Sequence, residues 1–79
     1  MSRYIATFHT HLSALLTCQS LTASGAEARM MPVPRKLSAS SGTCVAYQAA
    51  APLLDKMDAD VERVFQVDGE TYTLLLENE

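Results

Sequence analysis

The chain has 79 residues, the size of one small domain near the lower limit for a self-sufficient hydrophobic core. Apolar residues make up 48% of it, which excludes a disordered chain. The net charge of −3 argues against nucleic-acid binding, which depends on lysine and arginine to neutralise phosphates. We therefore expect a single domain over residues 1–79, and a homodimer would bury further surface on so small a chain.

The charges are unevenly distributed along the chain. Up to Cys44, the basic residues Arg3, Arg29, Arg35 and Lys36 face one carboxylate, Glu27, a local balance of about +3. The remaining residues have a balance of about −6 by the same count. A locally positive region in an acidic protein suits a small anion or an acidic partner surface better than DNA.

The two cysteines, Cys18 and Cys44, are too few for a disulfide framework. No apolar run approaches the roughly 18 residues of a membrane helix. Polar residues at positions 7 and 9–11 interrupt any signal-peptide core. The sequence therefore predicts a cytoplasmic protein with reduced thiols and no membrane partner.

The first predicted elements are a strand and an amphipathic helix. Residues 4–8 alternate and are rich in β-formers, which predicts a strand. Thr10 is a suitable N-cap for a helix over residues 12–24, and Gly25 is its natural stop. A helical wheel predicts that the buried face comprises Leu12, Ala14, Leu15, Leu16, Cys18, Leu21 and Ala23, and that the exposed face comprises Ser13, Thr17, Ser20 and Ser24.

The middle of the chain predicts two strands around a loop. Residues 28–33 form a second strand, which Pro32 and Pro34 confine to a sheet edge or a strand end. Residues 35–42 have the composition of a loop. Residues 43–48 alternate again, with Cys44 and Ala46 on the face opposite Val45 and Tyr47.

The last part predicts a short helix and a hairpin. Pro52 fits the first turn of a helix that ends near Asp60. Asp68-Gly69 lies between β-rich runs at 64–67 and 71–76, as in a two-residue hairpin whose central positions have positive φ. The element order is β-α-β-β-α-β with a further strand that closes the hairpin. It predicts an α+β, ferredoxin-like split βαβ sandwich, with two helices on one face of a mostly antiparallel sheet.

Cys44 is the candidate nucleophile. It follows a Ser/Gly loop and two basic residues, Arg35 and Lys36, and such surroundings would lower the pKa of the thiol. The alternative is that Cys44 is a small hydrophobic residue of a strand. Cys18 belongs to the apolar side of the helix and is expected to be structural.

The loop and two histidines complete the candidate site. Ser38, Ser40, Ser41 and Gly42 could cradle an anion, with a plain surface loop as the alternative. His9 and His11 are candidates for proton transfer to a thiol, or exposed histidines at a junction. Their positions do not direct both rings to one metal ion. The phosphate-loop and dinucleotide patterns are absent, so we expect no cofactor.

Three stretches carry a resemblance to a known family: residues 4–11, residues 31–38, which open with Met31-Pro32-Val33-Pro34-Arg35, and residues 40–45. Over residues 4–47 the chain resembles the selenium/sulfur carrier-like family of small bacterial domains. The resemblance implies a compact α/β fold and a role in sulfur metabolism, in the handling of reduced sulfur or selenium. A sulfur donor such as a cysteine desulfurase would then be the partner.

The chain departs from the pattern of that family at one position. The family loop commonly has a cysteine before the glycine, where this chain has Ser41. Serine cannot hold a persulfide, because its oxygen is neither soft nor easily deprotonated. The sequence therefore leaves two hypotheses, neither of which makes the protein a true enzyme. Either Cys44 transfers reduced sulfur, or the chain is a small-anion-binding or protein-interaction module that has lost the carrier cysteine.

Overall fold

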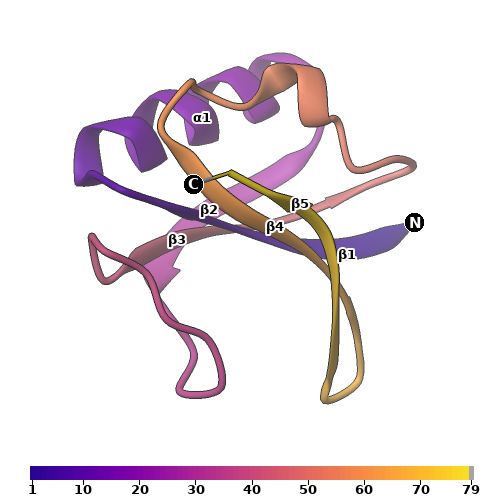
Figure 1. The fold of residues 1–79 in the computed structure, drawn as a ribbon. Coiled ribbons are helices and arrows are strands. Elements are labelled where there is room, and N and C mark those ends of the chain that lie inside the picture. Colours follow the sequence, from indigo (N-terminus) through magenta and orange to yellow (C-terminus); the bar gives the residue numbers. More distant parts are fainter. Residues whose placement is uncertain (79) are drawn as a thin grey trace.

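The computed structural model describes residues 1–78 as one antiparallel sheet covered on one face by a helix (Figure 1). The sheet order is β2-β3-β1-β4-β5. The elements in chain order are β1 (Ser2–Phe8), α1 (His11–Ala23), β2 (Glu27–Pro32), β3 (Thr43–Ala49), the 3₁₀ turn η1 (Leu54–Lys56), β4 (Val61–Asp68) and β5 (Thr71–Glu77).

The sheet confirms the predicted α+β class. β3 lies between β1 and β2 and pairs antiparallel with both, so the connection through α1 is a split βαβ unit. β1 likewise lies between β3 and β4. The arrangement is compatible with a ferredoxin-like class, but its topology differs from the predicted one because the second helix is missing.

The predicted helix after Pro52 is wrong. Leu53 has a φ of +53°, in the left-handed region, so a right-handed helix cannot run through it, and only the turn η1 forms. Tertiary contacts hold the segment in this shape. The hydroxyl of Tyr47 donates to the carbonyl oxygen of Pro52 over 2.5 Å, and Leu53 and Met57 pack against the core.

The helix α1 begins and ends within one residue of the prediction, but its buried face only partly matches the predicted one. The hydroxyl of Thr10 accepts a hydrogen bond from the amide of Ser13 over 3.1 Å, and Gly25 follows the helix at a φ of +91°. The buried helical residues are Ser13, Ala14, Thr17 and Leu21. Three leucines that were predicted to be buried are instead exposed: Leu12, Leu15 and Leu16.

Asp58 explains why two polar residues of α1, Ser13 and Thr17, lie inward. The hydroxyl of Ser13 donates to Oδ2 of Asp58 over 2.6 Å, and the amide of Asp58 donates to Oγ1 of Thr17 over 2.9 Å. Buried hydroxyls are tolerated where they have such partners. Small side chains also let the helix approach the sheet closely. Cys18, on the border of this face, is partly buried against the core.

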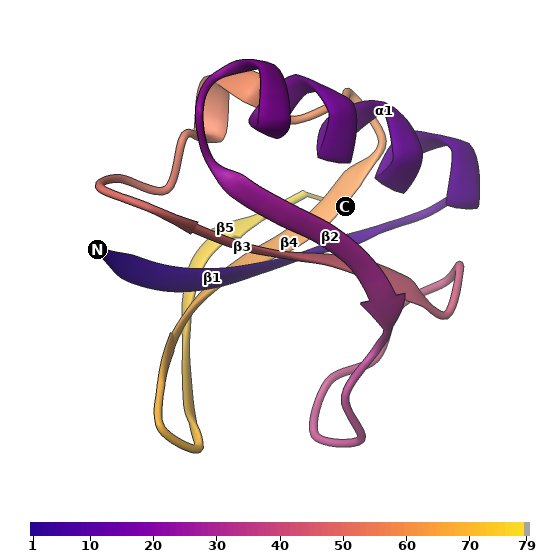
Figure 2. The same ribbon diagram turned by 180° about the vertical axis from the view of Figure 1, so that it is seen from behind.

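The two faces of the sheet are unlike. Toward α1 lie the core residues of three central strands, among them Tyr4 and Tyr47, whose stacked rings have centroids 5.1 Å apart. Because side chains alternate along a strand, Ile5, Cys44 and Ala46 point to the other face. That face carries no helix and is flanked by two loops, residues 33–42 and the β4–β5 turn (Figures 1 and 2). This confirms the predicted alternation of residues 43–48.

The prolines and the hairpin behave largely as predicted. β2 is an edge strand of the sheet, as Pro32 requires. β4 and β5 form the hairpin, but Asp68 pairs with Thr71, so the turn residues are Gly69 and Glu70 rather than Asp68 and Gly69. Within residues 1–78, Gly69 supplies the positive φ of this turn, +60°. The hairpin turn is thus of the kind that has glycine at its first central position.

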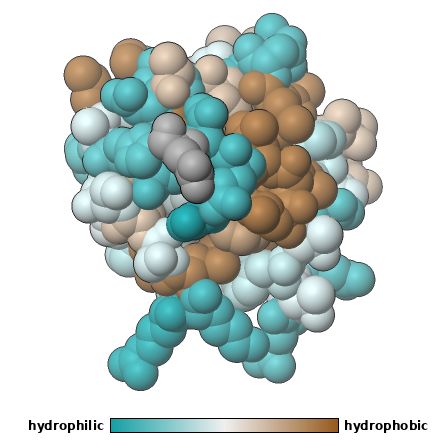
Figure 3. Space-filling view, viewed as in Figure 1, coloured by the Kyte–Doolittle hydropathy of each residue, from teal (hydrophilic) through white to brown (hydrophobic). Residues whose placement is uncertain are grey.

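The remaining surface includes apolar side chains. Leu74 and Leu75 of the edge strand β5 are exposed, and Figure 3 shows a group of apolar side chains on the face of the molecule that carries this strand. No helix described in residues 1–78 has the length and apolar character needed to cross a membrane.

The Asp58 contacts predict a stability that depends on pH. The hydrogen bond from Ser13, followed by that from the amide of Asp60, lowers the pKa of Asp58 below its ordinary value. A group with a lowered folded-state pKa stabilises the fold above its unfolded-state pKa, and this stability is lost as pH falls through the folded-state pKa. We expect urea unfolding to show a larger loss of stability between about pH 5 and pH 3 for the wild type than for Asp58→Asn.

Asp55→Asn is the matched control for this measurement. It removes the same charge from an exposed residue of the same segment. We expect it to keep the acid dependence of the wild type. Equal acid dependence in Asp58→Asn and the wild type would contradict the role of Asp58.

Candidate functional site

The loop of residues 33–42 packs against the junction between β1 and α1. It leaves the sheet after Pro32, closes with a hydrogen bond from the amide of Val33 to the carbonyl oxygen of Gly42, 3.2 Å, and re-enters the sheet as β3. The amide of Ser41 donates to the carbonyl oxygen of Phe8 over 3.4 Å. The loop therefore meets the segment that carries His9 and His11.

One of the predicted anion-binding residues of the loop, Ser40, binds a carboxylate of the chain itself. The amide of Ser40 donates to Oε1 of Glu62 over 2.8 Å, and the hydroxyl of Ser40 donates to Oε2 over 3.1 Å. Nδ1 of His9 lies 3.6 Å from the same Oε2. The side chain of Glu62 is only 12% exposed. An external anion at Ser40 would have to displace this carboxylate.

Ser41 is fixed by the residue two positions further on. Its hydroxyl donates to the carbonyl oxygen of Thr43 over 3.1 Å and accepts from the amide of Thr43 over 3.2 Å. Oγ1 of Thr43 in turn lies 3.3 Å from Nδ1 of His11. Residues 40, 41 and 43, together with His9, His11 and Glu62, thus form one polar cluster at this end of the sheet, which we call the loop cluster.

Cys44 lies outside the loop cluster and is shielded from solvent. It is 0% exposed, and its Sγ lies 3.8 Å from the carbonyl oxygen of Pro32. Burial raises the pKa of the Cys44 thiol to about 11. The predicted lowering of this pKa is therefore wrong, because burial removes the thiolate from water and so disfavours the charged form.

Arg35 and Lys36 do not act on the thiol. Both are exposed, and Nζ of Lys36 lies 3.5 Å from the carbonyl oxygen of Glu70 in the β4–β5 turn. Ser38 and Gly42 are also exposed. Of the predicted site residues, the structure gathers His9, His11, Ser40 and Ser41, and it places Cys44, Arg35 and Lys36 apart from them.

Two further features concern chemistry. Cys18 and Cys44 are both free thiols, and burial also raises the pKa of Cys18. Within residues 1–78 no group of three or more His, Cys, Asp or Glu side chains is arranged to hold a metal ion. Glu62 could not be identified from the sequence, because it lies 22 residues from Ser40 and no local pattern indicates that the two residues are in contact.

Fold and site together define a small α+β domain with a hydrogen-bonded surface loop and a buried cysteine behind it. The family described as "Putative Se/S carrier protein-like" matches residues 3–64, which include the whole loop. The chain belongs to this family. The predicted resemblance is thus confirmed and extends into β4. No curated protein and no solved structure matches the chain.

Proposed function

We propose that this protein is a non-enzymatic binding member of the Se/S carrier-like family, which uses its loop to contact a partner and does not carry sulfur covalently. The proposal rests on the side chains at positions 41 and 44. Ser41 stands where the resemblance to the family leads us to expect a cysteine, and Cys44 is 0% exposed with a thiol pKa of about 11.

A buried thiol of this kind is a poor sulfur acceptor. The thiolate is the nucleophile, and it must reach the donor sulfur. A pKa of about 11 leaves Cys44 almost fully protonated at neutral pH. Ser41 is partly exposed, but a hydroxyl oxygen does not form a persulfide.

The loop itself is built as a fixed surface. Hydrogen bonds tie Ser40 to Glu62, and Ser41 to Phe8 and Thr43. These contacts hold the loop in place without a bound ligand, which reduces the entropy lost when a partner binds. Exposed residues of the loop include Arg35 and Ser38. The partner we propose is a sulfur donor of the cysteine-desulfurase class.

Sulfur loading tests the proposal. The reduced protein is incubated with a cysteine desulfurase and cysteine and then weighed intact, and transfer of one sulfur atom would add about 32 Da. We expect no adduct on the wild type under conditions that load a control carrier. We also expect the wild type to bind the desulfurase, and a Cys44→Ser variant to bind it equally well.

Two results would contradict this proposal. One is a wild-type adduct that Cys44→Ser abolishes while Cys18→Ser retains it. The other is failure of the wild type to bind the desulfurase.

A second candidate function is transfer of reduced sulfur through Cys44. Its support is the position of Cys44 directly behind the start of the loop, where Sγ lies 3.8 Å from the carbonyl oxygen of Pro32. This function requires a movement that exposes the thiol. This function requires the adduct on Cys44 that the binding function excludes, so the same mass measurement separates the two.

A further inference from the structure

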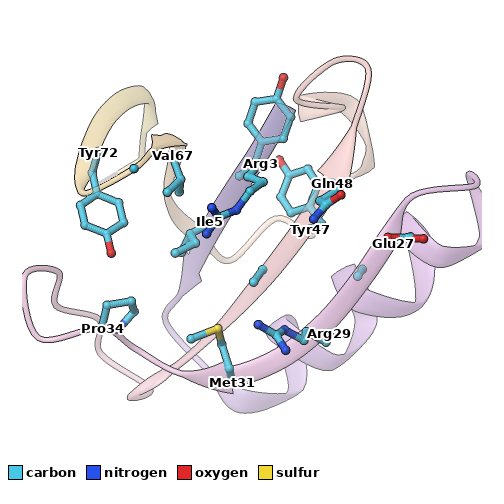
Figure 4. A pocket seen from close by; sticks show the side chains of 14 residues that line it. Arg3, Ile5, Glu27, Arg29, Met31, Pro34, Tyr47, Gln48, Val67 and Tyr72 are labelled. Carbon is cyan, nitrogen blue, oxygen red and sulfur yellow. The ribbon is translucent and has the colours of Figure 1, made fainter. Parts of the chain in front are cut away.

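The sheet face turned away from α1 carries a hollow of about 480 Å³ (Figure 4). A volume of this size lies within the range of sites for small organic ligands. Its lining comes from all five strands, with Ile5 and Ala46 in the middle of the sheet. The hollow is separate from the loop cluster, because none of the residues of that cluster lines it.

Two loops make the walls of the hollow. Pro34, at the start of the loop of residues 33–42, lines one side, and Gly69 and Tyr72 of the β4–β5 hairpin line the other. In Figure 4 the side chain of Tyr72 points toward Pro34. The side chain of Lys36 reaches the carbonyl oxygen of Glu70 at 3.5 Å and so links the two walls. A flat protein surface could not reach the sheet between them.

Two arginines supply positive charge. Arg3 of β1 and Arg29 of β2 line the hollow, and within residues 1–78 neither guanidinium forms an ion pair. Figure 4 shows both side chains at the hollow. Their strands are two inter-strand spacings apart, roughly 10 Å, a span that two arginine side chains can bridge. Glu27 is the acidic residue in the lining.

The rest of the lining is largely apolar. Ile5, Met31, Val67 and Tyr72 line the hollow beside the arginines. Guanidinium groups form paired hydrogen bonds with carboxylates and phosphates, whereas an apolar floor favours a hydrocarbon or aromatic body. A ligand that contacts both the guanidinium groups and the apolar lining must therefore contain an oxyanion and an apolar part in one molecule.

We propose that this hollow binds a small organic oxyanion, a carboxylate or a phosphate attached to an apolar or aromatic body. Arg3 and Arg29 bind the oxyanion, and the apolar lining holds the body against the sheet. The site is distinct from the anion-binding loop that the sequence predicts, and it does not depend on the binding function proposed for that loop.

Amide chemical shifts of the ¹⁵N-labelled full chain test the proposal. The probes are 1-naphthyl phosphate, 1-naphthoate and the neutral 1-naphthol. We expect at least one of the two oxyanions to shift the amides of Ile5, Ala46 and Val67, and to bind at least about tenfold more tightly than 1-naphthol. Binding of only one oxyanion would identify whether the group recognised is a phosphate or a carboxylate.

Arginine variants test which side chains bind the oxyanion. We expect Arg3→Gln and Arg29→Gln each to weaken binding of the oxyanion about tenfold, as for loss of one charge-assisted contact. Arg35→Gln removes the same charge from an exposed residue that does not line the hollow, and it is expected to keep the wild-type affinity. Because all three arginines are exposed, the variants are expected to fold.

Three results would overturn the proposal. The first is equal affinity for 1-naphthol and both oxyanions. The second is wild-type affinity in both Arg3→Gln and Arg29→Gln. The third is a set of shifted amides confined to the exposed leucines of α1 instead of the sheet.

Discussion

Replacing Ser41 by cysteine is expected to create the reactive thiol that the wild type lacks. The new side chain would be partly exposed, and the amide of Thr43, which now donates to Oγ of Ser41 over 3.2 Å, would stabilise the thiolate. In a Cys18→Ser background we expect Ser41→Cys to react with iodoacetamide at neutral pH on the order of 30-fold faster than Cys44 does. In the sulfur-loading experiment, we expect the adduct at position 41 only.

The control for this experiment is the same variant without Cys44. The triple variant Cys18→Ser, Ser41→Cys, Cys44→Ser is expected to keep the fast reaction in full. Reaction of Ser41→Cys no faster than that of Cys44 would contradict the assignment of residue 41 as the accessible position of the loop.

Replacing Leu21 by alanine is expected to destabilise the fold by about 2–5 kcal/mol, the usual cost of truncating a fully buried leucine. Leu21 is 0% exposed and belongs to the core cluster of buried residues. Leu16 lies on the same helix and is 44% exposed. We expect Leu16→Ala to change the free energy of unfolding by less than about 1 kcal/mol. Urea unfolding monitored by circular dichroism measures both.

This pair tests the orientation of α1 directly, because the two substitutions are chemically identical and differ only in the face of the helix. The helical wheel of the sequence puts both leucines inside. A loss for Leu16→Ala as large as that for Leu21→Ala would support the wheel and contradict the structure.

Features with a local cause were predictable from the sequence. The hydroxyl of Thr10 caps α1, and Gly25 ends it, because both effects depend on residues within one turn. Alternation of side chains predicted β3, and Pro32 predicted an edge strand. The β4–β5 hairpin was predicted from Asp68-Gly69, although the turn lies one residue later.

Features that depend on distant partners were not predictable. The wheel counted Ser13 and Thr17 as polar and placed them outside, but both are buried because Asp58, more than 40 residues away, satisfies their hydroxyls. The second helix failed because the residues after Pro52 are held by contacts with the sheet and with α1. Tertiary contacts overrule helical preference in such short segments.

The same distinction between local and distant causes applies to the candidate site. Proximity in sequence brought Cys44, Arg35 and Lys36 together as one candidate, yet Cys44 is fully buried while both basic residues lie exposed at the surface. The loop cluster depends on Glu62, and the hollow depends on Arg3 and Arg29 from separate strands. The sheet register puts Arg3 and Arg29 on the same face as Ile5 and Ala46, which their separation in the sequence does not reveal.

Titration of Cys44 shows whether its thiol is buried and protonated at neutral pH. The rate of alkylation of the folded Cys18→Ser variant is measured as a function of pH, with mass spectrometry to confirm the modified residue. We expect a slow reaction whose rate rises with pH toward a thiol pKa of about 11. A midpoint at or below the ordinary thiol value of about 8.5, with fast reaction at neutral pH, would contradict it.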